Sequence, residues 1–313
     1  MNENMQRWTL AVLAHVALVA AWYLFVKLGN VPRFVMPSPG DTLDALLQPN
    51  YNWWANIAVT ATEIFGGYFL ALVVGVALAL AFTWSRTLEA FFMPLLVSLN
   101  MIPKVALGPL IIVWFKYGVF PNTLMAFSIC VFPILLTTAR GLREIEPELL
   151  DLVRSLKGSR WQLFSKVQLP GALPYIFSGM KVGAILAVAG AIVGEFLGSD
   201  KGLGYLMLQV QVTLDTPAMF MAVIMITLIG MALYGLVLAL ERWLVVKATP
   251  EDTWKIVRQF WLDNGFTLTV EKPDAGLMET DWAENRADIP PDFIRSTIGK
   301  YFDAFYNTYK REK

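Results

Sequence analysis

Six long apolar segments dominate this sequence and set the tightest limit on its fold. A helix needs about 20 apolar residues to cross the hydrocarbon layer of a membrane. The six candidate segments are Thr9–Leu28, Ile57–Phe82, Phe91–Phe115, Thr123–Ala139, Tyr175–Leu197 and Ala218–Leu240. Hydrophobic residues make up 56% of the chain and charged residues 16%, against roughly 45–50% and 25% in soluble domains. This composition excludes an ordinary soluble enzyme, a disordered chain and a nucleic-acid binder with a basic face. It predicts an all-α membrane protein.

The distribution of charge marks a domain boundary near residue 247. Residues 1–247 carry 16 basic and 13 acidic residues, whereas the much shorter stretch 248–313 carries 9 and 12. The apolar segments all lie in the first part. Within the second part, residues 250–264 have a helical pattern, and the sequences GFTLTVEK and LMETDWAEN flank a PDAG turn as the strands of a hairpin would. We therefore expect a membrane domain over 1–247 and a short α+β tail over 248–313.

Basic residues beside the spans predict the orientation, because cytoplasmic loops of membrane proteins are rich in lysine and arginine. With the N-terminus inside, four basic residues lie on the outer side, namely Lys27, Arg33, Lys116 and Lys201. Ten lie on the cytoplasmic side: Arg7, Arg86, Arg140, Arg143, Arg154, Lys157, Arg160, Lys166, Arg242 and Lys247. The count places both termini in the cytoplasm.

The third apolar segment differs from the others because prolines interrupt it. Pro94, Pro103 and Pro109 fall within it, and Asn100 and Lys104 lie beside the central proline. A broken helix exposes backbone polar groups, which is tolerated only inside protein or beside a water-filled path. A lysine there would be expensive against lipid. Asn100, Pro103, Lys104 and Pro109 are therefore candidate pathway residues.

Other ionisable residues near the spans are Glu63, Lys181 and Glu195. Each could extend to the membrane surface or pair within the bundle, and Glu195 is a further candidate for the pathway. Two carboxylates within the membrane also leave open a proton-coupled secondary carrier. The chain has one cysteine and one histidine, which excludes an internal disulfide and a multi-histidine metal site. We expect no catalytic residue, no cofactor and no metal.

Small residues recur at helical spacing in two spans, a pattern typical of helices that pack closely in lipid. One stripe consists of Gly67, Ala71, Gly75 and Ala79, and the other of Gly179, Gly183, Ala187 and Ala191. Helix packing is the simpler interpretation of both stripes.

The longest polar stretch of the membrane domain, residues 140–174, has the pattern of two short amphipathic helices. The first opens at Pro147 and ends at Lys157–Gly158, since glycine is a common helix stop. Ser159 followed by Gln162 predicts a capping box for the second, and we expect Leu169–Pro170 to close it. A compact helical pair on the cytoplasmic face is suited to contact a partner.

The stretch PELLDLVRSLKGSRWQLFSKVQLPGALPYIFSGMKVG, residues 147–183, resembles the cytoplasmic EAA loop of binding-protein-dependent ABC importer permeases. LNMIPKVALGPLIIVWFKYG and GAIVGEFLGSDKGLGYLMLQVQ resemble the nitrate/sulfonate/taurine branch of that family, which includes pyrimidine-precursor transporters. The likeness covers about residues 8–246. The sequence departs from the family at residues 151–153, where Asp-Leu-Val replaces the usual Glu-Ala-Ala, and at Lys157, which stands at the usual glycine.

This resemblance implies a six-helix type I ABC importer transmembrane domain that works as a dimer in the bacterial inner membrane. A periplasmic solute-binding protein would deliver the solute, and two cytoplasmic ATPase subunits would receive the loop. The chain lacks the G-x-x-x-x-G-K-[ST] phosphate loop, so we expect a transport subunit and not an enzyme. The implied coupling residues are Asp151, Arg154, Ser155, Lys157, Gly158, Ser159, Trp161, Leu169 and Pro170.

The tail resembles a fragment of a different protein, the C-component lipoprotein of the outer-membrane β-barrel assembly machinery. That lipoprotein works in the periplasm, whereas the charge count places this tail in the cytoplasm. A natural fusion and an artificial join of two reading frames would both fit, and the join is the favoured interpretation. A scaffold or assembly protein, inferred from the tail alone, is the weaker alternative function.

Overall fold

The computed structural model describes residues 3–144 and 159–245, together with residues 254, 258, 259, 262, 267–272 and 277–280 near the C-terminus. The chain divides into two compact units, Met1–Val245 and Val246–Lys313.

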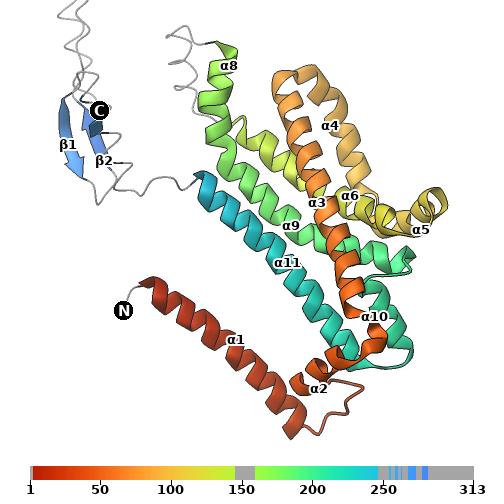
Figure 1. Ribbon diagram of the computed structural model, residues 1–313. Coiled ribbons are helices and arrows are strands. Elements are labelled where there is room, and N and C mark those ends of the chain that lie inside the picture. The colour runs from red at the N-terminus through yellow and green to blue at the C-terminus, as the bar shows by residue number, and fades with distance from the viewer. Residues whose placement is uncertain are drawn as a thin grey trace, which may run out of the picture. The chain divides into compact units, whose positions relative to one another are not determined.

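Helices make up nearly all of the first unit (Figure 1). The long ones are α1 Glu3–Leu28, α3 Trp53–Trp84, α4 Arg86–Met101, α5 Lys104–Phe115, α6 Val119–Gly141, α9 Leu169–Gly198, α10 Leu203–Val212 and α11 Thr216–Val245. The short ones are α2 Pro39–Asp44, two 3₁₀ turns at Ala45–Leu47 and Pro49–Tyr51, α8 Arg160–Leu163 and a π turn at Phe164–Gln168.

The all-α membrane fold predicted from the sequence is confirmed. Four continuous helical segments of the described chain are long and apolar enough to cross a membrane: Pro49–Trp84, Val119–Gly141, Trp161–Gly198 and Thr216–Leu244. The first predicted span corresponds to the shorter apolar helix Val12–Leu28. The third is not one straight helix, because α4 and α5 meet at an angle of 86°.

The bend between α4 and α5 falls at Ile102–Pro103, the central one of the three prolines. Proline lacks an N–H group and its ring clashes with the preceding turn, so it breaks a helix that has no other support. Pro94 and Pro109 lie inside α4 and α5 respectively. Only one of the three prolines therefore ends a helix.

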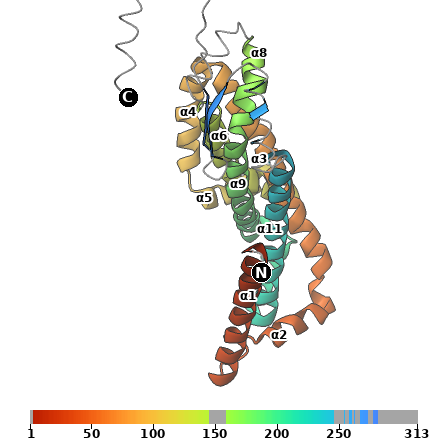
Figure 2. The same cartoon turned by 90° about the vertical axis from the view of Figure 1, so that its left-hand side faces the viewer.

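Helices α3, α6 and α9 lie side by side and form the core of the first unit (Figures 1 and 2). Glycines bring their backbones into close contact. A Cβ atom on Gly67 would lie 2.7 Å from the backbone oxygen of Thr123, and one on Gly190 would lie 2.6 Å from the Cα atom of Ala126. A Cβ atom on Gly183 would lie 2.8 Å from the side chain of Ile134. The small residues on these helices therefore serve close packing, as predicted.

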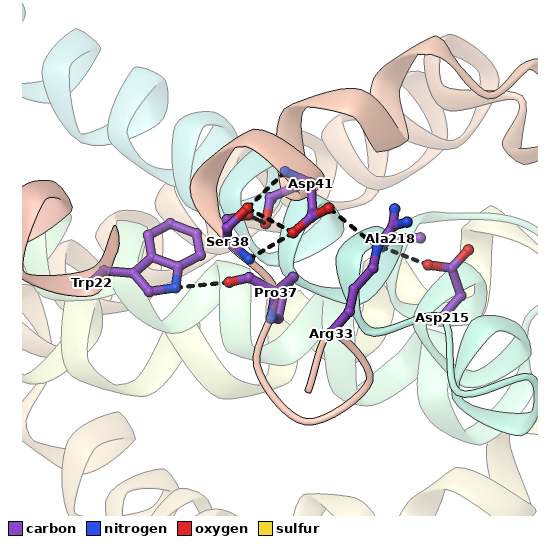
Figure 3. A network of polar contacts seen from close by, with 8 residues as sticks. Trp22, Arg33, Pro37, Ser38, Asp41, Asp215 and Ala218 are labelled. Atoms are coloured by element: carbon purple, nitrogen blue, oxygen red, sulfur yellow. Dashed lines mark hydrogen bonds and ion pairs between the residues drawn. The ribbon is translucent and has the colours of Figure 1, made fainter. Parts of the chain in front are cut away.

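Helix α1 packs differently from the core helices. Among its described side chains from Thr9 to Leu28, only Trp22 and Val26 are not exposed. The Trp22 ring stacks on Phe220 of α11, with ring centroids 5.7 Å apart. The Trp22 Nε1–H group donates a hydrogen bond to the Pro37 carbonyl at 3.0 Å (Figure 3). In the single chain, most of the apolar surface of α1 is left uncovered.

A polar network orders the connection that follows α1 (Figure 3). Ser38 and Asp41 form a capping box at the start of α2, in which the Asp41 N–H group donates to Ser38 Oγ at 3.2 Å and the Ser38 N–H group donates to Asp41 Oδ2 at 3.1 Å. Arg33 lies 3.4 Å from the Asp41 carboxylate. The hydrogen bond from Ser38 lowers the pKa of Asp41 below its usual value, so this carboxylate keeps its charge in mildly acidic solution.

The described part of the second unit contains a hairpin. Strand β1, Leu268–Lys272, pairs antiparallel with β2, Leu277–Thr280, and the register places Val270 opposite Glu279 and Lys272 opposite Leu277. Residues 254, 258, 259 and 262 are helical. Arg258 reaches across to Glu271 of β1 at 3.0 Å. These elements follow the helix and hairpin pattern predicted for the tail.

Candidate functional site

The first part of the candidate site is the start of the helical segment that follows Ser159. The Ser159 N–H group donates to Gln162 Oε1 at 2.8 Å, and the Gln162 N–H group donates to Ser159 Oγ at 3.2 Å. These reciprocal bonds form the capping box predicted from the sequence, because each side chain satisfies a backbone donor that the first helical turn leaves unpaired. The chain is thereby fixed where the second amphipathic helix begins.

The prediction that Leu169–Pro170 ends this helix is wrong. Helix α8 continues through the π turn Phe164–Gln168 directly into α9, so that one helical segment runs from Trp161 to Gly198. The Leu169 N–H group bonds to the carbonyl of Phe164, five residues back. This wider turn takes up one extra residue before Pro170, which falls in the first turn of α9, where a missing N–H group is tolerated.

Phe164 anchors this part of the segment to the core. Its side chain is buried, and its ring packs edge-on against Trp84 at the end of α3, with ring centroids 5.7 Å apart. Trp161 lies one turn earlier, also with its ring centroid 5.7 Å from that of Phe164, and is 65% exposed. The ring of Trp161 therefore lies at the surface, next to a ring that is packed into the core.

A cavity of about 870 Å³ lies next to this anchor. Arg86 and Glu89 of α4, Arg143 after α6 and Gln168 of the π turn are among its lining residues. Arg143 and Glu89 form an ion pair that ties the end of α6 to the start of α4. The cavity is open and has charged residues in its lining, so it does not form a closed solute site.

A second ion pair on this face joins Arg140 and Glu144 at 3.0 Å, one turn apart at the end of α6. The hydrogen bond from Arg140 lowers the pKa of Glu144 below its usual value.

Five of the implied coupling residues, namely Asp151, Arg154, Ser155, Lys157 and Gly158, lie outside the described residues, as does the whole of the first predicted amphipathic helix. Ser159 caps the start of the continuous segment, and Trp161, Leu169 and Pro170 lie on it.

The bent segment α4–α5 carries four of the candidate pathway residues. Asn100, Pro103 and Pro109 are exposed in the single chain. Lys104 Nζ donates to the Leu99 carbonyl at 2.9 Å, and so satisfies one of the backbone acceptors near the end of α4. Gly108 is buried against Leu197 of α9, and a Cβ atom there would overlap that side chain. The four candidate residues therefore lie on one bent segment, which packs against α9 at Gly108.

The fifth candidate, Glu195, lies in a different setting. Its side chain is 1% exposed, and it accepts a hydrogen bond from Thr60 Oγ1 at 2.6 Å. Close by, Asn122 Nδ2 donates to Glu63 Oε1 at 2.9 Å. We call Thr60, Glu63, Asn122 and Glu195 the buried polar cluster. Thr60 lies within the apolar segment Ile57–Phe82 and Asn122 immediately before Thr123–Ala139, and neither was among the candidates predicted from the sequence.

Lys181, the remaining ionisable residue of α9, pairs with Glu241 of α11 at 2.9 Å. Pairing within the bundle was one of the two roles expected for it.

Comparison with known proteins assigns the membrane domain to a family. Residues 71–246 match the model of the family described as binding-protein-dependent transport system inner membrane component. The riboflavin transport system permease protein RibX of Chloroflexus aurantiacus is 36% identical over 230 residues, which cover 73% of this chain and 86% of that protein. The formylaminopyrimidine transport permease protein ThiX of Halalkalibacterium halodurans is 28% identical over 230 residues, covering 73% of this chain and 92% of that protein.

The tail matches a protein of another kind, as its sequence indicated. The outer membrane protein assembly factor BamC of Thiobacillus denitrificans is 53% identical over 73 residues, which are 23% of this chain. The chain spans only about a fifth of that protein's length, 20%.

The helices that are long and apolar enough to span a membrane, the capping box predicted at Ser159 and the match over residues 71–246 agree with one another. The chain belongs to the binding-protein-dependent transport system inner membrane component family, and it is the permease subunit of an ABC importer.

Proposed function

We propose that this permease takes up a small solute across the bacterial inner membrane, driven by ATP hydrolysis on separate ATPase subunits bound at the Arg140–Pro174 loop. The observation that carries the proposal is the continuous helical segment Trp161–Gly198. It begins beside the exposed ring of Trp161 and ends at the opposite end of the bundle. A force applied to its cytoplasmic end is thus delivered to the core helix α9 without an intervening hinge loop.

The solute class is proposed from the relatives. One is named as a riboflavin permease and the other as a formylaminopyrimidine permease, and the sequence resembles the nitrate/sulfonate/taurine branch. We therefore propose a small solute of the sulfonate or pyrimidine-precursor type, delivered by a periplasmic solute-binding protein that does most of the selecting.

A second copy of the chain completes the proposed path. Helices α4 and α5 expose large apolar side chains, among them Phe91, Leu95, Val113 and Trp114. A polar path needs protein on both sides, because exposed backbone at membrane depth must not face lipid. In the homodimer the two bent segments face one another, with Asn100, Pro103, Lys104 and Pro109 along the path, while lipid covers the remaining apolar surface.

Reconstitution tests the coupling directly. The chain is placed in proteoliposomes with its ATPase and binding protein, and uptake is measured with ATP, with a proton gradient, and with neither. We expect uptake that needs ATP and the binding protein, and equal uptake by a chain truncated after Lys247, because the tail is proposed to have no transport role. Uptake driven by the proton gradient alone would instead identify a secondary carrier, which the two buried carboxylates keep as the alternative.

The orientation proposed from the charge count has its own test. Single cysteines replacing Arg33 and Lys201, both exposed, are expected to react with a membrane-impermeant maleimide from the periplasmic side. A cysteine replacing Arg143 should react only after the inner membrane is opened. Native Cys130 is buried and should stay unlabelled. Labelling at position 143 in intact cells would reverse the topology.

A further inference from the structure

The first turn of α10 is held by side chains from other helices. The Gly202 N–H group donates to Asn56 Oδ1 at 2.9 Å, and the Leu203 N–H group donates to Thr60 Oγ1 at 2.8 Å. The next two N–H groups, of Gly204 and Tyr205, donate to Glu195 Oε2 at 2.5 and 3.3 Å. The first backbone donors of a helix have no partner within the helix. Here four in succession are satisfied by α3 and α9.

Glu195 accepts more of these bonds than any other group in the buried polar cluster. One oxygen accepts from two backbone N–H groups and the other from the Thr60 hydroxyl. The backbone passes so close to the carboxylate at Gly202, where φ is +109°, that a Cβ atom there would overlap it. Three donors converging on one carboxylate, at the N-terminus of a helix, stabilise its negative charge.

Glu63 lies beside Glu195 but in a poorer environment: it is one turn of α3 after Thr60, which donates to Glu195, and its partner Asn122 lies against Gly194, the residue before Glu195. Its side chain is 0% exposed. One oxygen accepts from Asn122, and the other, Oε2, has no hydrogen-bond partner among the described residues. Within residues 3–144 and 159–245, no lysine, arginine or histidine forms an ion pair with either carboxylate. Two adjacent buried carboxylates without a cation do not both ionise.

We propose that Glu63 carries a proton, which it donates to Glu195, and that the single charge left on Glu195 fixes the first turn of α10 to α3 and α9. The proton belongs on Glu63 because its carboxyl group accepts one hydrogen bond and has an oxygen without a partner among the described residues. The carboxyl group of Glu195 accepts three hydrogen bonds, which favour its charged form. Glu195 is then a positioning residue for the outer end of the transport path. Only this link to transport rests on the proposed function.

The two glutamates should respond differently to the same substitution. In Glu63→Gln the side-chain amide can donate to Glu195 as the proton did, and its oxygen can still accept from Asn122. In Glu195→Gln the charge is lost and an N–H₂ group replaces one of the two accepting oxygens. Hydrogen bonds to a buried charged group are strong enough that their loss changes an equilibrium by roughly tenfold or more.

Hydrogen–deuterium exchange of the peptide covering residues 199–212 in the full-length protein measures how firmly Glu195 holds the first turn of α10. We expect Glu195→Gln to speed exchange at the start of α10 by about tenfold or more, and Glu63→Gln to leave it within about twofold of wild type. Glu241→Gln is the matched control. It removes the partner of Lys181 and should not alter exchange in α10. Equal acceleration by Glu63→Gln and Glu195→Gln would overturn the assignment of the proton.

Infrared absorption reports the proton itself. The carbonyl stretch of a protonated carboxyl group lies above the amide and carboxylate bands. That signal should be present in wild type and absent from Glu63→Gln. Its persistence in Glu63→Gln would contradict the proposal.

Uptake in the reconstituted complex then tests the link to transport. Glu195→Gln should lower uptake by about tenfold or more, whereas Glu63→Gln should keep it. Full uptake by Glu195→Gln, with fast exchange in α10, would show that the hydrogen bonds of Glu195 to α10 do not position the transport path. If wild type itself shows no ATP-driven uptake, the proposed function fails, while the exchange and infrared results still decide the location of the proton.

Discussion

Gly190→Ala is expected to lower the free energy of unfolding of the permease by about 1–3 kcal/mol, the range found when a well-packed core is overfilled. The added methyl group would lie 2.6 Å from the Cα atom and 3.1 Å from the backbone nitrogen of Ala126. Neither atom belongs to a flexible side chain, so α6 and α9 would have to move apart. Thermal unfolding of the purified protein in detergent measures the effect.

Gly235→Ala is the matched control for this substitution. Position 235 also lies inside a long helix, and a Cβ atom there would have no neighbour within 4 Å. Alanine favours helix over glycine by up to about 1 kcal/mol, so this variant should be as stable as wild type or more stable. If Gly190→Ala unfolded at the same temperature as Gly235→Ala, the close contact between α6 and α9 would not limit stability.

Phe164→Ala is expected to uncouple the permease from its ATPase. Removing a buried aromatic ring typically costs about 3–5 kcal/mol, and this ring joins the start of the segment Trp161–Gly198 to Trp84 of α3. The spans themselves do not depend on it, so insertion should be normal. Retention of the ATPase during purification and ATP-dependent uptake should both fall by about tenfold or more, since 1.4 kcal/mol already corresponds to a factor of ten.

Two further variants make this expectation specific. Phe164→Leu keeps most of the apolar volume and should retain most of the coupling. Phe34→Ala makes the same truncation at a side chain that is 60% exposed on the opposite side of the membrane domain, and it should behave as wild type. Wild-type uptake by Phe164→Ala would show that the force does not pass through this contact.

Features decided by local sequence were predictable. The capping box at Ser159 needs only residues three apart, and the prolines of the third apolar segment predicted a broken helix without indicating which of the three would break it. The stripes of small residues likewise indicated close packing before the partner helices were known. In each case the interaction that decides the structure lies within a helical turn or repeats at helical spacing.

Features that depend on distant residues were not predictable in the same way. Glu63 and Glu195 are 132 positions apart in the sequence, and no pattern in it indicates that they meet. The π turn before Pro170 was missed for a different reason. A proline after an amphipathic stretch usually ends a helix, but here packing of Phe164 against α3 holds the segment in line, and one wider turn accommodates the proline.

The glycine contacts of the core also constrain the order in which the chain can fold during synthesis. Domains fold from the N-terminus as the ribosome extends them, and α3 and α6 can meet through Gly67 as soon as both have entered the membrane. The side of α6 that receives Gly190 stays open until α9 emerges, after the residues between α6 and α9 have been translated. In the nascent permease this side of α6 must therefore stay uncovered until α9 has been synthesised and can pack against it.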